Sequence, residues 1–363
     1  MALTRNFVLQ VASAAKEAAY DTAAAIDQRI NVNIGNIPQE SVQVIDDSDK
    51  VGGSEEATDA VVFAQSASLD LGINRVKPFA LGFVGAYGLG AVSSALADSG
   101  SAASSVKQHT CTPVDNDGSM NSFSFEAWKT ASTKVKYSGG LLSSLSLSVN
   151  RGANRMVNLT AAVVASGTTA SGGGAQTEPA ETQLNAATAG IWLDHTALAA
   201  GKAVASARSQ TLDPSTSDLA SPTDIAASVR SVTWDFSNNV NIDDLYRVGG
   251  GNTLAVGQRS GRSQSLTLDF DYADDTYITA LKSQTEYAFQ MIVRGAAAAA
   301  VGDAGYYHGF NLIFPVMQLQ NVEVADDSGT LVNRMTFTVM DDDGGTHKSV
   351  YFDVFNEQAA YMA

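Results

Sequence analysis

Cysteine is almost absent from this 363-residue chain, and this limits how the fold can be held together. Cys111 is the one cysteine, so the fold must depend on packing and strand pairing instead of disulfides. A lone thiol is typical of proteins made in a reducing cytoplasm. The N-terminus lacks a signal-peptide pattern, and no run approaches the ~18 apolar residues of a membrane span. These absences predict cytoplasmic synthesis without secretion or membrane insertion.

Basic residues are also scarce. The chain has 22 Lys and Arg against 38 Asp and Glu, which gives a formal net charge of −16. A protein that grips nucleic acid neutralises phosphates with Lys and Arg, so this balance argues against tight nucleic-acid binding. An acidic surface repels DNA, and it keeps a protein soluble before assembly. The same acidity is equally consistent with a general solubility role.

Patterns that carry catalytic or metal chemistry are missing as well. The histidines are scattered along the chain: His109, His195, His308 and His347. They lack metal-ligand spacing, and nothing near His109 and Cys111 completes a site. The string Gly88-Leu89-Gly90 lacks the strand–helix context of a dinucleotide loop, so we interpret it as a flexible turn. No Gly-x-Ser-x-Gly elbow is present. We therefore expect no enzyme, cofactor or metal site.

Period-two alternation of apolar and polar residues is the dominant pattern in the chain. It is typical of half-buried β-strands. The alternating segments are 123–128, 145–149, 156–164, 232–236, 266–270, 287–291, 335–339 and 350–355. A short helix is predicted where Asp274 and Asp275 can cap a segment that carries Ile278 and Leu281. The predicted fold class is all-β with a short flanking helix.

Composition divides the chain into four parts. Residues 1–25 are interpreted as an N-terminal arm, with an Ala-rich stretch over 11–25 that could be helical. Residues 26–166 and 225–363 hold the predicted strands and are interpreted as two β modules. Residues 167–224 are low in complexity and are interpreted as a linker or long loop. A connection of this length is unusual inside a compact domain, which favours a boundary there.

An internal repeat relates the two modules. Three landmarks occur twice in the same order: Lys50-Val51-Gly52-Gly53 with Arg247-Val248-Gly249-Gly250, Gln65 to Asp70 with Gln264 to Asp269, and Asn154-Arg155-Met156 with Asn333-Arg334-Met335. The first copy holds about 20 extra residues between its second and third landmarks. We assign these to a Ser-rich loop at 91–118. The chain is thus interpreted as two tandem copies of one β-sandwich module.

The polar faces of the predicted strands are candidate functional surfaces, because alternate residues of a strand share one side. The candidates are Ser66, Ser68 and Asp70 in the first copy and Ser265, Thr267 and Asp269 in the second, with Ser144, Ser146 and Ser148 on a similar face. These side chains are small and neutral or acidic. Two interpretations are open: the solvent-facing side of an ordinary sandwich, or the wall of a channel through which DNA slides without sticking.

A set of motifs, in its order along the chain, carries a family resemblance. The motifs are Glu17-Ala18-Ala19-Tyr20-Asp21-Thr22, the run Ser122 to Val164 with its Tyr137–Gly140 turn, Asn238-Asn239, Gln264 to Phe270, and Val350 to Asn356. Together they resemble the tail tube proteins of long-tailed, non-contractile bacteriophages, although Asp21 stands where that family usually has Gly. The resemblance covers most of the chain.

The resemblance implies β-sandwiches assembled into rings, whose inner strands form a continuous multi-subunit β-barrel. Stacked rings would form the virion tail tube, which guides the tape measure protein, meets tail completion and tip proteins, and passes genomic DNA without binding it tightly. The six candidate residues would face the lumen. A duplicated module implies trimeric rings with pseudo-six-fold symmetry, with a hexamer as the alternative. The N-terminal arm and residues 167–222 are expected to bridge rings.

A different function is the main rival. A surface or tail-tip β-sandwich that binds a receptor or carbohydrate would also be all-β, and it would need aromatic side chains clustered on exposed loops. Tyr306-Tyr307 is the candidate pair.

Overall fold

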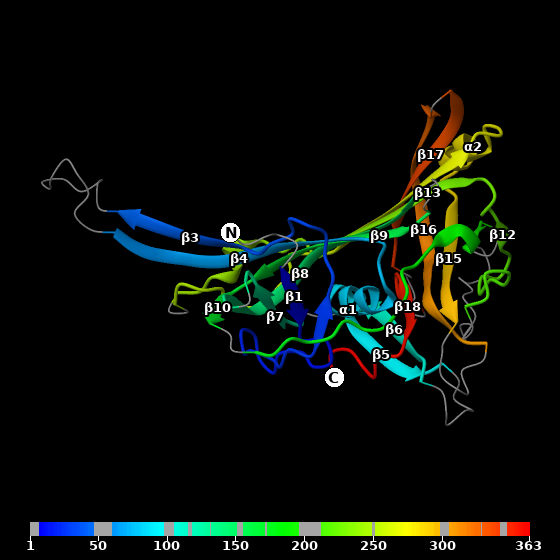
Figure 1. Cartoon of the computed structure of the whole chain (residues 1–363). Helices are drawn as coiled ribbons and strands as arrows, with labels where there is room; N and C mark the ends of the chain where they lie inside the picture. The colour runs from blue at the N-terminus through cyan, green and yellow to red at the C-terminus, as the bar shows by residue number, and fades with distance from the viewer. Residues whose placement is uncertain are drawn as a thin grey trace, which may run out of the picture.

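Antiparallel β-sheet accounts for most of the regular structure, as the alternation predicted (Figure 1). The computed structural model describes residues 7–46, 60–97, 105–114, 118–130, 132–150, 155–170, 173–195, 212–248, 251–297, 305–327, 329–341 and 347–363. None of the helices in these ranges has the length and apolar character needed to cross a membrane.

Two units follow one another along the chain. The first contains β1 (Val8–Val11), β2 (Gln28–Ile30), β3 (Gln39–Asp46), β4 (Ala60–Asn74), α1 (Pro78–Leu89), β5 (Gly90–Leu96), β6 (Lys107–Pro113), β7 (Phe123–Trp128), β8 (Lys134–Asn150), β9 (Val157–Ala165) and β10 (Gly167–Ala170). The second contains β11 (Gly190–Asp194), β12 (Thr223–Asp224), β13 (Val229–Ser237), β14 (Ser263–Asp271), α2 (Thr276–Lys282), β15 (Glu286–Ala297), β16 (Tyr307–Asp327), β17 (Thr330–Val339) and β18 (Tyr351–Asn356).

Strand pairing repeats the same scheme in both units. The main sheet has the order β3-β4-β9-β8 in the first unit and β13-β14-β17-β16 in the second. In each unit a helix follows the second strand of this set. The outer strands match too: β1 pairs with β7 beside β8, as β11 pairs with β15 beside β16. The duplication is therefore present in the topology.

The repeat begins earlier in each half than the sequence suggested. Residues 167–224 do not form a plain linker, because β10 ends the first unit and β11 and β12 begin the second. Trp192 and Leu193 of β11 are buried. The N-terminal segment is likewise no free arm, since β1 pairs with β2 and β7 and its Leu9 and Val11 are buried. The described part of 11–25 contains no helix.

The extra residues of the first copy form a hairpin instead of a loop. Strands β5 and β6 lie within the segment predicted as a loop at 91–118, apart from Gly90, and they have no counterpart between α2 and β15. Strand β6 pairs with β18, so this insertion extends a sheet of the second unit.

The structure contradicts the third landmark pairing of the repeat and describes only part of the first. The third pairing is wrong, because Met335 lies within β17 whereas Met156 precedes β9. In the first landmark, 50–53 and 249–250 lie outside the described residues.

Helix α1 was missed because it is apolar on every side and shows no amphipathic period. All of its residues are buried, and Pro78 starts it. Gly90 ends it with φ of 94°, so the Gly88-Leu89-Gly90 string is a helix terminus and not a flexible turn. A Cβ at Gly82 would lie 2.6 Å from the Tyr361 ring, which shows how closely the C-terminal segment packs on this helix. Helix α2 is confirmed and contains Ile278 and Leu281.

The two units share one sheet. Strand β8 pairs with β13 over Ser144–Asn150 and Ser231–Ser237, so the main sheet runs unbroken from β3 to β16. Figure 1 shows this sheet as a curved layer, with the projecting β3–β4 hairpin at one end, β17 at the other and α1 beneath. On the α1 side, Trp234 of β13 is fully buried against Phe314 and Phe352.

Asn238 fixes the end of this junction. Its side-chain amide donates to the carbonyl oxygens of Gly88 and Leu142, both at 2.9 Å, and its backbone N–H donates to the Ser143 carbonyl at 2.8 Å. The residue is 1% exposed. One side chain of the second unit thus satisfies carbonyls at the end of α1 and on β8.

We predict that Asn238→Ala lowers the free energy of unfolding by about 2 kcal/mol, because two buried carbonyls lose their donors. Urea unfolding followed by tryptophan fluorescence would measure the change. Asn241→Ala is the matched control, since Asn241 is exposed and bonds only to Asp244 on its own segment, at 2.9 Å. Equal stabilities of the two variants would contradict this role for Asn238.

The N-terminus of α1 generates a second prediction. Glu181 accepts a hydrogen bond from the Phe79 N–H at 2.7 Å, and burial raises the pKa of its carboxyl to about 7. Because this pKa lies above that of the unfolded chain, Glu181 lowers the free energy of unfolding as the pH rises from about 4.5 to 7. The loss is at most about 3 kcal/mol, reduced by partial solvent access.

Glu181→Gln should remove this pH-dependent loss and leave the variant more stable than wild type at pH 8. Thermal melts between pH 5 and 8 would show it. Parallel stability curves for the two proteins would show that Glu181 does not titrate in this range.

Candidate functional site

The face of the main sheet opposite α1 is lined by small polar side chains. The pairing registers place residues from both units in rows across this face. One row is Gly72, Thr160, Ser146, Asp235, Ser265 and Thr338, and the next is Asn74, Asn158, Ser148, Thr233, Thr267 and Thr336. We call this surface the polar face. It is continuous because β8 and β13 are paired.

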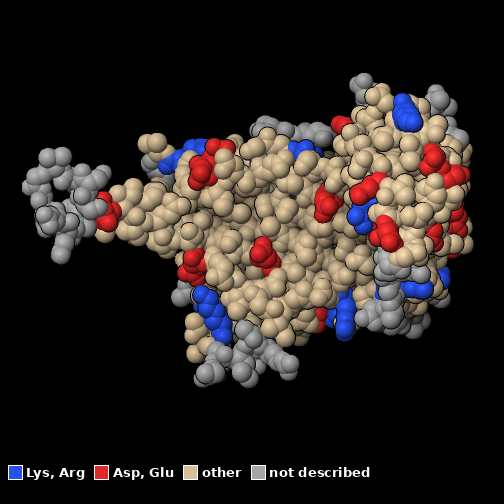
Figure 2. All heavy atoms as spheres, turned by 90° about the horizontal axis from the view of Figure 1, so that it is seen from above, with Lys and Arg blue, Asp and Glu red and all other residues tan. Residues whose placement is uncertain are grey.

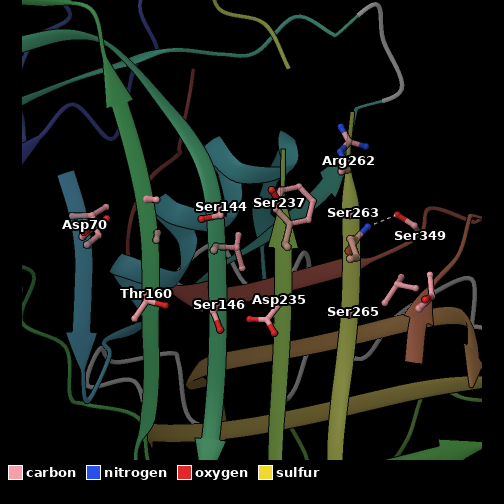
Figure 3. Close-up of a pocket in the computed structure, with 18 of the residues that line it drawn as sticks. Asp70, Ser144, Ser146, Thr160, Asp235, Ser237, Arg262, Ser263, Ser265 and Ser349 are labelled. Carbon is pink, nitrogen blue, oxygen red and sulfur yellow. Dashed lines mark hydrogen bonds between the residues drawn. The ribbon is translucent and has the colours of Figure 1, made fainter. Parts of the chain in front are cut away.

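A hollow of about 1010 Å³ opens on the polar face. Its lining comes from six adjacent strands, β4, β9, β8, β13, β14 and β17, together with Asn36 before β3 and Asp341 and Ser349 after β17. Figure 3 shows the side chains of Thr160, Ser146 and Asp235 side by side on neighbouring strands of the first and second units. At the rim, the Gln264 amide donates to the Ser349 hydroxyl at 3.0 Å.

The hollow contains few positive charges. Asp70, Asp235 and Asp341 line it, and Arg262 is the one Arg or Lys among its lining residues. The Arg262 guanidinium is partly occupied, because it donates to the Val114 carbonyl at 2.8 Å. Figure 2, seen from above the sheet, shows mostly uncharged surface between scattered charged groups. A phosphate in the hollow would meet hydroxyls and carboxylates more often than cations.

The structure brings some predicted site residues together and separates others. Asp70 and Ser265 both line the hollow, although they come from different units. Thr267 and Asp269 lie further along β14 on the same face. Asp269 is not a free carboxylate, since it accepts from Arg334 at 2.9 Å and from the Ser231 hydroxyl at 2.8 Å.

Ser66 and Ser68 lie outside the hollow, on the part of β4 that leads to the projecting hairpin. Ser68 pairs with Val164, and Val164 pairs with Leu141. Both apolar residues are buried under Leu245 and Leu254 of the segment that connects β13 to β14. The polar face therefore ends near these serines.

Several residues of the hollow were not singled out from the sequence, among them Thr160, Asp235 and Ser237. Each alternates with buried neighbours in a predicted strand or directly beside one, so the face of the sheet on which it lies was predictable. Its neighbours on the adjacent strands were not predictable, because no local sequence pattern indicates that β8 and β13 lie next to each other.

The reactive side chains of His109 and Cys111, outside the hollow, are buried in the fold. His109 is buried between the Ser94 hydroxyl at 2.8 Å and the Asn356 side-chain oxygen at 3.0 Å, and burial lowers its pKa to about 4. Burial also raises the pKa of the Cys111 thiol. Within the described residues, no group of three or more His, Cys, Asp or Glu side chains could hold a metal ion.

No family model matches the chain, and a comparison with curated proteins gives no match.

The scarcity of cations on the polar face generates a prediction. Replacing Ser144, Ser146, Ser263 and Ser265 with Lys should convert a surface that does not hold duplex DNA into one that does, with an affinity gain on the order of tenfold or more at low salt. Gel retardation at 50 and 200 mM salt would measure it, and the same four substitutions to Glu are the control. Retardation by the wild-type chain would contradict the assignment.

Proposed function

We propose that this chain is the structural subunit of a bacteriophage tail tube, which assembles into stacked rings and conducts the genome during delivery to the host. The observation that carries the proposal is the polar face, a continuous and cation-poor surface that spans both units of one curved sheet. The order of the family-like motifs supports it. A hydroxyl- and carboxylate-lined wall lets DNA pass because it offers phosphates few partners.

Assembly into a closed barrel would also resolve a problem posed by the sheet itself. Open sheet edges present unpaired N–H and C=O groups and invite aggregation, whereas closure removes the edges. The α1 side of the sheet is already covered by the core of the same chain, which leaves the polar face to line a lumen. Stacked rings of this kind need no catalytic centre.

Three chains per ring is the stoichiometry that the duplication favours. Each chain contributes two topologically equivalent units, so three chains supply six units with pseudo-six-fold symmetry. A hexamer would require the two units of one chain to occupy different environments. Their shared sheet argues for equivalent positions instead. The tape measure protein, tail completion and tip proteins, and genomic DNA in transit are the partners that this role entails.

The rival role in receptor or carbohydrate binding receives less support. Tyr306 and Tyr307 are half-buried against a core cluster, and the Tyr307 ring stacks on the Arg294 guanidinium at 4.5 Å. Phe63 is the one aromatic residue among the markedly exposed large apolar side chains of the described residues. An aromatic platform for sugars is therefore not present in the part of the chain described.

We expect negative-stain electron microscopy of the concentrated, purified chain to show hollow tubes built of stacked rings. End views should show six similar lobes around the lumen, and the mass per ring should equal three chains. Solid filaments, or a chain that remains monomeric at all concentrations and salt conditions, would contradict the proposal. A ring mass of six chains would retain the tube and reject the trimer.

A further inference from the structure

The two ends of the main sheet carry free strand edges. Strand β3 pairs with β4 on one side, and no described strand pairs with its other side. At the opposite end, β16 pairs with β17 along 317–327, and β15 leaves the other side of β16 at Gln318. Residues 319–327 of β16 therefore have an edge to which no strand within the described ranges is bonded. The two free edges are of similar length.

Exposed apolar side chains gather at these same two ends. Among the described residues nine large apolar side chains are markedly exposed. Seven of them lie on the strands at the free ends: Val42, Val44, Ile45, Val61 and Phe63 on the β3–β4 hairpin, and Val324 and Leu331 on β16 and β17. The outer part of this hairpin, where 43–46 pair with 60–64, is only two-stranded within the described residues, and exposed apolar side chains on such a ribbon are typical of an interaction surface.

The chain contains its own template for that partner. By the repeat, β3 is the counterpart of β13, and β16 is the counterpart of β8. Within one chain, β8 of the first unit accepts β13 of the second in antiparallel pairing. The remaining combination is β16 of the second unit with β3 of a first unit. The free ends of one chain lie at opposite ends of its sheet (Figure 1), so that first unit must belong to another copy.

We propose that residues 319–323 of β16 pair antiparallel with Gln39–Gln43 of β3 of a second copy of this chain, in the manner of β8 with β13. This inference rests on the proposed function in one respect, because the contact is the one that would close the proposed ring. The contact is heterologous, and its repetition gives a closed ring when the rotation between neighbouring copies closes, as the proposed tube requires.

Irregularities in the strands set the register. Strand β8 has a bulge between Leu142 and Ser144, and β16 has one between Leu319 and Asn321. Superposing the two bulges makes Asn321 the counterpart of Ser144.

The same superposition identifies the residue opposite. It makes Ser66 the counterpart of Ser263, and therefore Ser41, which pairs with Ser66, the counterpart of Ser237. The second sequence landmark instead matches Ser66 with Ser265, two residues further along β14. Because the shift is two residues, both alignments place Ser66 on the same face of the sheet. Because Ser144 faces Ser237, Asn321 should face Ser41 of the neighbouring copy.

Disulfide cross-linking tests this contact. The double variant Ser41→Cys with Asn321→Cys introduces two thiols at exposed positions, and the native Cys111 is buried and does not compete. After mild oxidation of the assembled full-length chain, non-reducing gels should show linked dimers and trimers. The linked fraction should exceed that of each single variant, and of the control pair Thr216→Cys with Asn321→Cys, on the order of tenfold. Reduction should restore single chains.

The outcomes separate this contact from the proposed function. Tubes seen by electron microscopy without linkage of the double variant, and also without linkage of the neighbouring pairs Gln39→Cys or Gln43→Cys with Asn321→Cys, would overturn the β16–β3 contact and leave the tube intact. Linked oligomers that never form tubes would support the contact and reject the tube. Linkage at Gln39 or Gln43 alone would overturn the register derived from the bulges.

Discussion

Strands β8 and β13 pair backbone to backbone over seven residue pairs, and the remaining architecture depends on this contact. It unites two four-stranded sets into one sheet, and it places side chains of different units in common rows on the polar face. Buried residues on the other side of the same strands, Leu147 and Trp234 among them, join the shared core. Without this pairing, the hollow would lack one wall and each unit would have one more open edge.

Local patterns were sufficient to predict the all-β fold class and the side of each predicted strand on which a residue lies. Alternation around Leu266 and Trp234 correctly predicted strands β14 and β13, and the capping signal at Asp275 predicted α2. Helix α1 escaped because a helix buried on all sides has no period to detect. Strands β11 and β12 escaped because they are short and lie among Ala-, Ser- and Thr-rich residues, where local composition is typical of a loop.

Only part of the site could be predicted from the sequence, for a related reason. The side of Asp70 and Ser265 followed from strand parity, but their common hollow depends on the order of strands from distant parts of the chain. The ion pair of Asp269 with Arg334 also joins residues on two strands, and only their register brings them together. Parity is a local property, whereas adjacency is set by sheet topology, which local patterns do not encode.

Covalent fusion of the two units would affect the speed and fidelity with which the proposed ring assembles. In a ring of six units made from three chains, every second joint is already formed when a chain folds, at an effective concentration set by the tether and not by the cell. Fewer independent bodies must then lose translational freedom for each ring. Fusion also lets one unit diverge from the other, as the β5–β6 insertion has done, so the outside of such a ring would display features with three-fold spacing around a lumen of nearly six-fold symmetry.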